Sequence, residues 1–174
     1  MKEQIKELRV KIDGLSQLTK QMLVVVGVDM HGVEIKFQPV EIGECYKSLI
    51  LAKAWLGKVL EELGTENPYK SGYKEVKDIE PTADKDTPKV WHLETHIEKV
   101  DWLRQEIETV VNEIKQIPVG DTVRVVDVNG VIPEQSKFVP FSREFAIART
   151  CSYTHIRQAK FWLGFELQRI RENN

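Results

Sequence analysis

The stretches AKAWLGKVLEEL at residues 52–63 and AKFWLGFELQRI at residues 159–170 decide how this chain is organised. Both contain the string A-K-x-W-L-G, and they agree again at a leucine three residues after the glycine. The likeness extends upstream, where Lys36-Phe37-x-Pro39 matches Lys137-Phe138-x-Pro140. Because self-similarity on this scale indicates a repeated structural unit, the sequence predicts two copies of one unit in tandem.

Each copy begins with a segment of helical periodicity. Its apolar residues recur at three-and-four spacing, which places them on one face of a helix. The matched positions in the two copies are Ile5 with Val100, Leu8 with Leu103, Arg9 with Arg104, and Ile12 with Ile107. We therefore expect helices over approximately residues 2–22 and 92–117.

A β-hairpin is predicted to follow each of these helices. In the second copy, residues 122–125 alternate, and Asn129-Gly130 is well suited to a type I′ turn because both turn positions need positive φ. In the first copy His31-Gly32 takes the place of that pair. Each return strand ends at a proline, Pro39 or Pro140, and proline is tolerated in the first turn of a helix.

The last element of each copy is expected to be a long helix, over residues 40–63 and 141–171. In the first copy its apolar face is marked by Ile42, Tyr46, Leu49, Leu56, Leu60 and Leu63. The predicted fold class is α+β and predominantly helical, with tandem duplicated α-β-β-α units over 1–64 and 91–174. Residues 65–90, rich in Gly, Pro, Asp and Lys, predict a linker. This linker is expected to be either mobile or wrapped over the surface, with Tyr69, Tyr73 and Val76 as its anchors.

The composition excludes several classes of protein. Lys and Arg total 25 against 27 Asp and Glu, so the formal charge of −2 disfavours binding to duplex nucleic acid through phosphate neutralisation. No apolar run approaches the ~18 residues of a membrane span, and the N-terminal MKEQIKELRVKI has the pattern of an amphipathic helix rather than of a signal sequence. We expect a cytoplasmic protein with no membrane partner.

No motif for catalysis, metal binding or a cofactor stands out. Cys151 and His155 lie four apart and share a helix face, but such pairs arise freely by chance. His92 and His96 have the spacing of two metal ligands, yet a third ligand is not evident and a solvated helix start explains them as well. Gly-rich phosphate loops are also missing. We expect no enzyme, no metal and no cofactor, with Cys45 and Cys151 as small buried residues.

A cationic and aromatic set stands out on the last predicted helix. Arginine suits bidentate phosphate contacts, and aromatic rings offer planes on which a base can stack. The set comprises Arg143, Arg149, Tyr153, His155, Arg157, Lys160 and Trp162. One interpretation is an anion site, in which Arg143, Arg157 and Lys160 contact phosphates while Tyr153 or Trp162 stacks on a base. The other is a charged outer face with Trp162 in the core.

The matched lysines of the two copies, Lys53 and Lys160, are harder to explain by packing. Two cations at equivalent positions could face a shared pocket on a pseudo-twofold axis, where a symmetric anion would fit. The tryptophans of the same motif, Trp55 and Trp162, are more typical of helix packing than of ligand contact.

The stretch SREFAIARTCSYTHIRQAKFWLG, residues 142–164, resembles the helical hairpin shared by two phage immune-evasion sponge families, the anti-CBASS cyclic-nucleotide sponge and the Thoeris anti-defence sponge. Ser142-Arg143-Glu144 matches the first part of the family pattern. Thr154-His155-Ile156, with Ala159 and Trp162, matches the second part, four residues further along than in the family. The first copy has Glu41-Ile42-Gly43-Glu44 in place of Ser-Arg-Glu, and Lys47 at the position of Thr154.

This resemblance implies a protein without catalysis that captures a cyclic nucleotide or a cyclic ADP-ribose-type signal and so inhibits bacterial anti-phage defence. It implies a homo-oligomer with ligands at subunit interfaces, in the host bacterial cytoplasm if the protein is phage-encoded. It adds Thr154 and Lys47 to the candidate ligand-binding residues, which already include Lys53 of the matched lysine pair. Two other classes stay open: a helical protein-interaction or structural protein of phage or bacterial origin, and an enzyme that uses Cys151 and His155.

Overall fold

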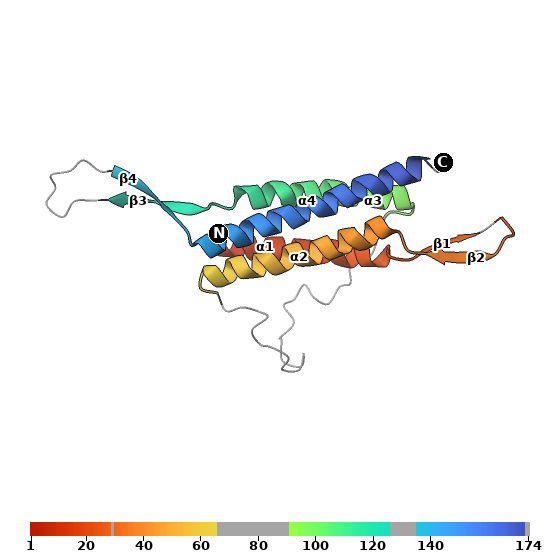
Figure 1. The fold of residues 1–174 in the computed structure, drawn as a ribbon, viewed down its shortest axis with the longest axis horizontal. Helices are drawn as coiled ribbons and strands as arrows, with labels where there is room; N and C mark the ends of the chain where they lie inside the picture. The colour runs from red at the N-terminus through yellow and green to blue at the C-terminus, as the bar shows by residue number, and fades with distance from the viewer. Residues whose placement is uncertain (29, 66–90, 126–134, 173–174) are drawn as a thin grey trace, which may run out of the picture.

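The computed structural model describes residues 1–28, 30–65, 91–125 and 135–172. In these ranges the chain forms four helices and two β-hairpins (Figure 1). In chain order the elements are α1 (Lys2–Gln21), β1 (Val25–Val28), β2 (Glu34–Phe37), α2 (Val40–Glu62), α3 (His96–Gln116), β3 (Gly120–Val125), β4 (Gln135–Pro140) and α4 (Arg143–Glu172). The order helix, hairpin, helix thus occurs twice.

The four helices lie side by side as an elongated bundle, and the two hairpins project from its opposite ends (Figure 1). The helix pair α2 and α4 shares the largest interface, followed by α3 with α4 and α1 with α2. The hydroxyl of Ser152 on α4 donates to the carbonyl oxygen of Ala52 on α2 at 3.0 Å. This buried contact joins the two halves of the chain at their centre.

The helices form because each carries an apolar stripe that the bundle buries. In α1 the side chains of Ile5, Leu8 and Ile12 have no exposed surface, and in α3 the same holds for Leu103 and Ile107. At roughly 25 cal/mol per Å² of buried apolar surface, this continuous core is the main favourable contribution to folding. The predicted helical periodicity is therefore confirmed at its core positions.

Local capping explains where two of the helices begin. Thr95 and Glu98 form a capping box at the start of α3, in which the Thr95 hydroxyl accepts from the Glu98 amide and the Glu98 carboxylate accepts from the Thr95 amide. The Ser142 hydroxyl accepts from the Phe145 amide at 3.0 Å at the start of α4. At both helix starts a side-chain hydroxyl therefore satisfies a backbone amide of the first turn.

The hairpins are antiparallel and pack on no helix in the described ranges. In the first hairpin Val28 pairs with Glu34, so residues 29–33 form a five-residue connection, longer than the two-residue turn expected at His31-Gly32. Gly32 has φ of 78°, the left-handed conformation that glycine adopts without strain. The corresponding pair Asn129-Gly130 lies outside the described residues.

The predicted fold class is confirmed at the level of a predominantly helical α+β protein with two small antiparallel hairpins. The linker at 65–90, with Tyr69, Tyr73 and Val76, falls almost entirely outside the described residues. None of the described helices combines the length and the apolar character that crossing a membrane requires.

Candidate functional site

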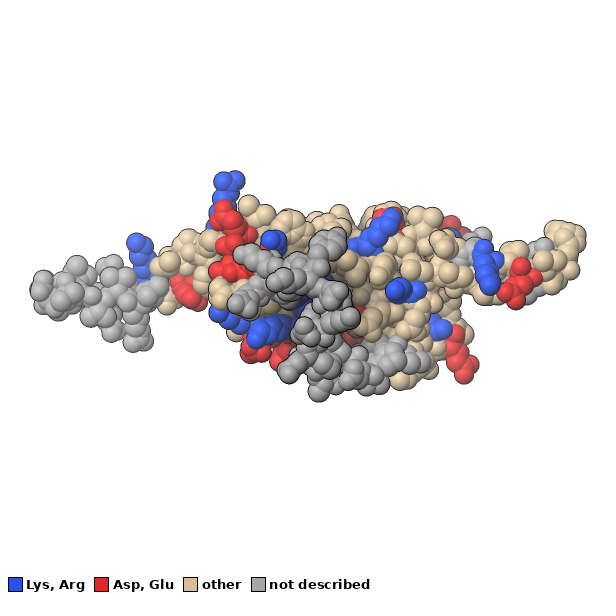
Figure 2. All heavy atoms as spheres, turned by 90° about the horizontal axis from the view of Figure 1, so that it is seen from below, with Lys and Arg blue, Asp and Glu red and all other residues tan. Residues whose placement is uncertain are grey.

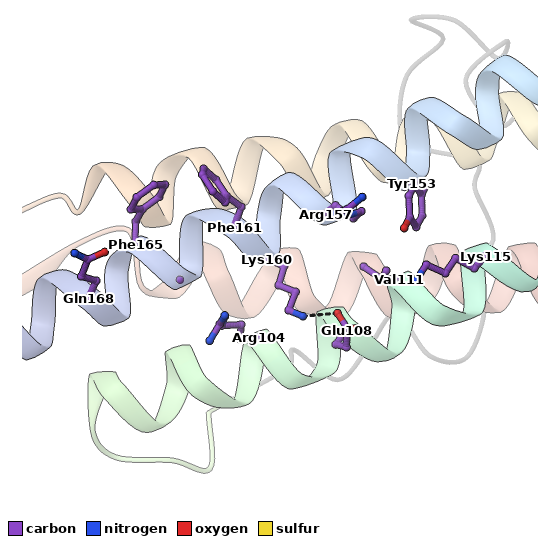
Figure 3. Close-up of a pocket in the computed structure, with 11 residues that line it drawn as sticks. Arg104, Glu108, Val111, Lys115, Tyr153, Arg157, Lys160, Phe161, Phe165 and Gln168 are labelled. Carbon is purple, nitrogen blue, oxygen red and sulfur yellow. Dashed lines mark hydrogen bonds and ion pairs between the residues drawn. The ribbon is translucent and has the colours of Figure 1, made fainter.

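A groove of about 620 Å³ lies between α3 and α4 (Figure 3). Its volume is in the range of small-molecule sites, roughly 300–1,000 Å³. The lining residues are Arg104, Glu108, Val111 and Lys115 from α3, and Tyr153, Arg157, Lys160, Phe161, Gly164, Phe165 and Gln168 from α4. The three-and-four spacing within both sets is that of one helix face, so regular helix geometry places these side chains along a single surface.

The groove is strongly cationic, although the whole chain is slightly acidic. Four basic residues line it against one carboxylate, Glu108. The Lys160 ammonium donates to Glu108 Oε2 at 2.5 Å across the groove (Figure 3). This hydrogen bond, followed by the charges of Lys160, Lys115 and Arg157, holds the pKa of Glu108 below its usual value. Glu108 is therefore a carboxylate near neutral pH and holds Lys160 in the groove.

Arg104 lies between the helices where Lys160 and Glu108 meet (Figure 3). Its Nε is buried, and no hydrogen-bond partner for it exists among the described residues. A buried N–H without an acceptor costs free energy, and a guanidinium suits bidentate contact with phosphate or carboxylate. Arg104 is therefore suited to donate to an anion bound in the groove.

Aromatic rings lie along the α4 side of the groove, and they differ in what surrounds them. The Tyr153 ring is already engaged, with the Arg157 guanidinium 5.5 Å and the Lys115 ammonium 5.9 Å from its centre. Phe161 and Phe165 pack edge to face with centroids 4.5 Å apart, and their exposed fractions are 60% and 42%. Exposed rings of this size beside four cations provide a flat apolar surface at the edge of the groove.

Of the residues predicted from sequence, the groove brings together Tyr153, Arg157 and Lys160. Arg143 is exposed at the first turn of α4, and the 17 residues to Lys160 correspond to about 25 Å along the helix. Thr154 is exposed and does not line the groove, and His155 Nδ1 donates to Gln158 Oε1 at 2.9 Å on its own helix.

The remaining predicted residues lie elsewhere. Trp162 is half-buried and packs against the core, and Lys47 pairs with Glu44 at 2.6 Å. Lys53 forms an ion pair with Asp13 of α1, so it does not share the groove with Lys160. Arg149 donates to the carbonyl oxygens of Ile117 and Lys115 at 2.8 and 2.7 Å, which caps the end of α3.

Sequence reasoning missed Arg104, Lys115, Phe161 and Phe165 as groove residues. A signal for Arg104 was present, since an arginine recurs at the matched positions 9 and 104 within an otherwise apolar stripe. The signal for Phe161 and Phe165 was their i, i+4 spacing on the face that carries Arg157. The sequence alone did not predict which face of α3 packs opposite these residues of α4.

A second cluster of titratable groups joins the start of α3 to the end of α4. The carboxylate of Glu166 has no exposed surface; it accepts from His96 Nε2 at 2.5 Å and from Arg169 Nε and Nη2 at 2.7 Å each. Burial opposes its ionisation, but the hydrogen bonds from His96 and Arg169 outweigh burial and lower the pKa of Glu166 to about 2. Arg169 Nε also lies 4.0 Å from Glu41 Oε2, so the cluster extends to the first turn of α2.

The cysteines and histidines do not add a reactive site to the groove. Cys45 is fully buried, as predicted, and burial raises the pKa of its thiol. Cys151 is only partly buried, in contrast to the prediction, because it lies on a less enclosed face of α4. Across the described ranges, three or more His, Cys, Asp or Glu side chains do not come together as a metal site would require.

Comparison of the chain with protein-family models, with curated proteins and with solved structures gives no match.

Proposed function

We propose that the protein binds and sequesters a cyclic nucleotide or a cyclic ADP-ribose-type immune signal, without catalysis, and thereby inhibits bacterial anti-phage defence. The α3/α4 groove is the binding site in this proposal. Arg104, Arg157 and Lys160 supply phosphate donors from two facing helices. The resemblance of residues 142–164 to the sponge families supplies the class of ligand.

The observation that carries the proposal is the excess of positive charge in one groove of an acidic protein. Surface cations are usually interspersed with acids, as on the side of the bundle seen in Figure 2, where blue and red groups lie next to one another. In the groove four cations share one carboxylate, and Arg104 Nε has no acceptor in the described part of the chain. A bound dianion would offset most of this excess and would offer Arg104 Nε an acceptor.

The duplication belongs to the same proposal. Two fused copies of one helix-hairpin-helix unit would imitate within one chain the twofold dimer of a single unit. Matched ion pairs support this interpretation, since Lys53 with Asp13 corresponds to Lys160 with Glu108. In this proposal the protein acts as a homo-oligomer in the cytoplasm of the infected bacterium.

The first test is a thermal-shift screen of the purified protein against cyclic dinucleotides, cyclic trinucleotides and cyclic ADP-ribose isomers, with linear nucleotides as controls. A ligand bound only by the folded state raises the melting temperature according to its concentration relative to Kd. We expect a rise of several degrees for one cyclic species. The rise should vanish in Arg157→Ala/Lys160→Ala and persist in Lys47→Ala/Lys53→Ala, which removes two lysines outside the groove.

One observation favours a second candidate function, a protein-interaction scaffold. The hairpins contact no helix among the described residues, and Val26, Ile35 and Phe138 on them are 56%, 45% and 55% exposed. Two-stranded ribbons are marginally stable alone and can add strands from a partner. This function would be favoured if no nucleotide in the screen raises the melting temperature, and if a partner protein co-purifies with the wild type but not with a variant substituted at Ile35.

A further inference from the structure

The groove has two chemically different ends. Lys115, Tyr153 and Arg157 lie toward one end, and Phe161, Phe165 and Gln168 toward the other, with Lys160 and Arg104 between them (Figure 3). The eight residues from Arg157 to Phe165 correspond to about 12 Å of helix, and the five from Lys160 to Phe165 to about 7.5 Å. The shorter of these two spans is comparable with the separation between a phosphate and its base in a nucleotide.

The two aromatic residues suggested by sequence as stacking partners are not free to stack. Trp162 packs against the core, and the Tyr153 ring already has two cations beside it. A base on Tyr153 would have to displace the Arg157 guanidinium, which is itself a phosphate donor of the proposed site. Tyr153 is therefore better placed to hold Arg157 and Lys115 than to receive a base.

Phe161 and Phe165 have the opposite properties. They line the groove, their rings are 60% and 42% exposed, and their edge-to-face contact keeps the two planes at 85°. A planar ligand group lying flat on one ring meets the edge or side of the other, so the pair forms a corner rather than a single plate. Large apolar groups left exposed in a groove usually mark a binding surface.

The first copy offers no such corner. The positions matched to Phe161 and Phe165 are Ala54 and Lys58, and the one matched to Arg157 is Ile50. Lys58 pairs with Glu61 at 2.8 Å. The phenylalanine pair is thus a feature of the second copy alone, and it is not required by the packing that the two copies share.

We infer that Phe161 and Phe165 form the base-binding subsite of the groove, in which a heteroaromatic base stacks while its phosphate lies on Arg104, Arg157 and Lys160. This inference rests on the proposed function and names the part of the ligand that each end recognises. A base joined to an anionic group is the ligand class that the site takes. An anion without a base occupies only the cationic part.

Leucine substitution separates the two ends. Phe161→Leu and Phe165→Leu keep apolar volume but remove the aromatic face, and stacking contributes on the order of 1–3 kcal/mol per base, or about 5- to 150-fold in affinity. The nucleotide to use is the one that raises the melting temperature of the wild-type protein. By calorimetry we expect its affinity for Phe161→Leu/Phe165→Leu to be at least about tenfold lower than for the wild type. The affinity of this variant for inorganic pyrophosphate, the probe for the cationic part, should stay within about twofold. Tyr153→Leu, by contrast, should lower the affinity for both the cyclic nucleotide and pyrophosphate.

The outcomes distinguish the two proposals. If the wild-type protein binds pyrophosphate but no cyclic nucleotide, the proposed function fails. If it binds the nucleotide and the double leucine variant binds equally well, the function stands and the base subsite is wrong. If the double variant instead changes the oligomeric state by light scattering with nucleotide affinity unchanged, the phenylalanines belong to an interface between copies and the inference is overturned.

Discussion

The α3/α4 surface and its counterpart on α1/α2 have the same framework and different linings. In each, a lysine of the A-K-x-W-L-G motif reaches an acid on the preceding helix, Lys160 to Glu108 and Lys53 to Asp13. Around Lys160 the chain adds Arg157 and two phenylalanines, whereas the matched positions around Lys53 hold Ile50, Ala54 and Lys58. The lysine-acid pair therefore joins two helices in both halves, and the residues around it decide whether a groove can bind an anion.

The same contrast exists in the core. Val59 and Glu166 occupy matched positions and both are fully buried. The α1/α2 half has an ordinary apolar residue there, while the α3/α4 half has a carboxylate held by His96 and Arg169. Burying a charge is unfavourable unless it is paired and hydrogen-bonded, so the α3/α4 half depends on an ion-pair network that the α1/α2 half does not need.

The largest effect is expected from Glu166→Gln. The folded pKa of about 2 is below the ordinary value of 4.5, so the ionised carboxylate stabilises the fold above pH 4.5, and this contribution is lost as the pH falls toward 2. We expect the variant to lose roughly 2–3 kcal/mol of unfolding free energy at pH 7. The difference from wild type should shrink below pH 4.5, measured by urea denaturation across that range.

Glu166→Val makes the two cores alike and serves as the matched variant. It buries no unpaired amide, and His96 and Arg169 are partly exposed and can turn to water. Its unfolding free energy should therefore exceed that of Glu166→Gln at pH 7. Equal pH dependence in the wild type and the glutamine variant between pH 2 and 4.5 would show that the network does not stabilise this half.

The next effect is on binding, at the matched arginines. Arg104→Met keeps a long apolar side chain but removes the guanidinium beneath Gly164, and a hydrogen bond to a charged group contributes about 1.5–3 kcal/mol. We expect affinity for the ligand identified by the thermal-shift screen to fall roughly 10- to 100-fold by calorimetry. Arg9→Met in the first copy should leave it unchanged. Equal losses in the two variants would mean that both halves bind.

Much of the fold could be predicted from the sequence, because apolar residues at helical spacing indicate both a helix and the face that it buries. The stripe of Ile5, Leu8 and Ile12 predicted both a helix and its buried face, and the structure confirms each. The hairpin connection was predicted less well: the His31-Gly32 pair indicated a two-residue turn, but the two paired strands are joined by five residues.

The site was harder to predict than the fold, because a groove needs two surfaces. Tyr153, Arg157 and Lys160 share one helix face and could be grouped by spacing alone. Arg143 lies on the same helix, but the extra length of α4 before the motif puts it far from the others. Arg104 comes from a facing helix some 50 residues away in the chain, and only the packing of α3 against α4 brings it to Lys160.

The smallest effect tests the groove without removing any of its charges. A Cβ at Gly164 would lie 3.8 Å from Arg104 Nε and Nη2, an ordinary contact, while a Cβ at Gly43 of α2 meets nothing within 4 Å. Both are helix positions, so each change to alanine should raise the unfolding free energy by up to about 1 kcal/mol. Only Gly164→Ala places a methyl group over the guanidinium, so it alone should weaken ligand binding, by roughly threefold if about 0.6 kcal/mol is lost. Because the two variants are matched in stability, a loss of affinity shared by both could not come from the groove and would place the ligand elsewhere.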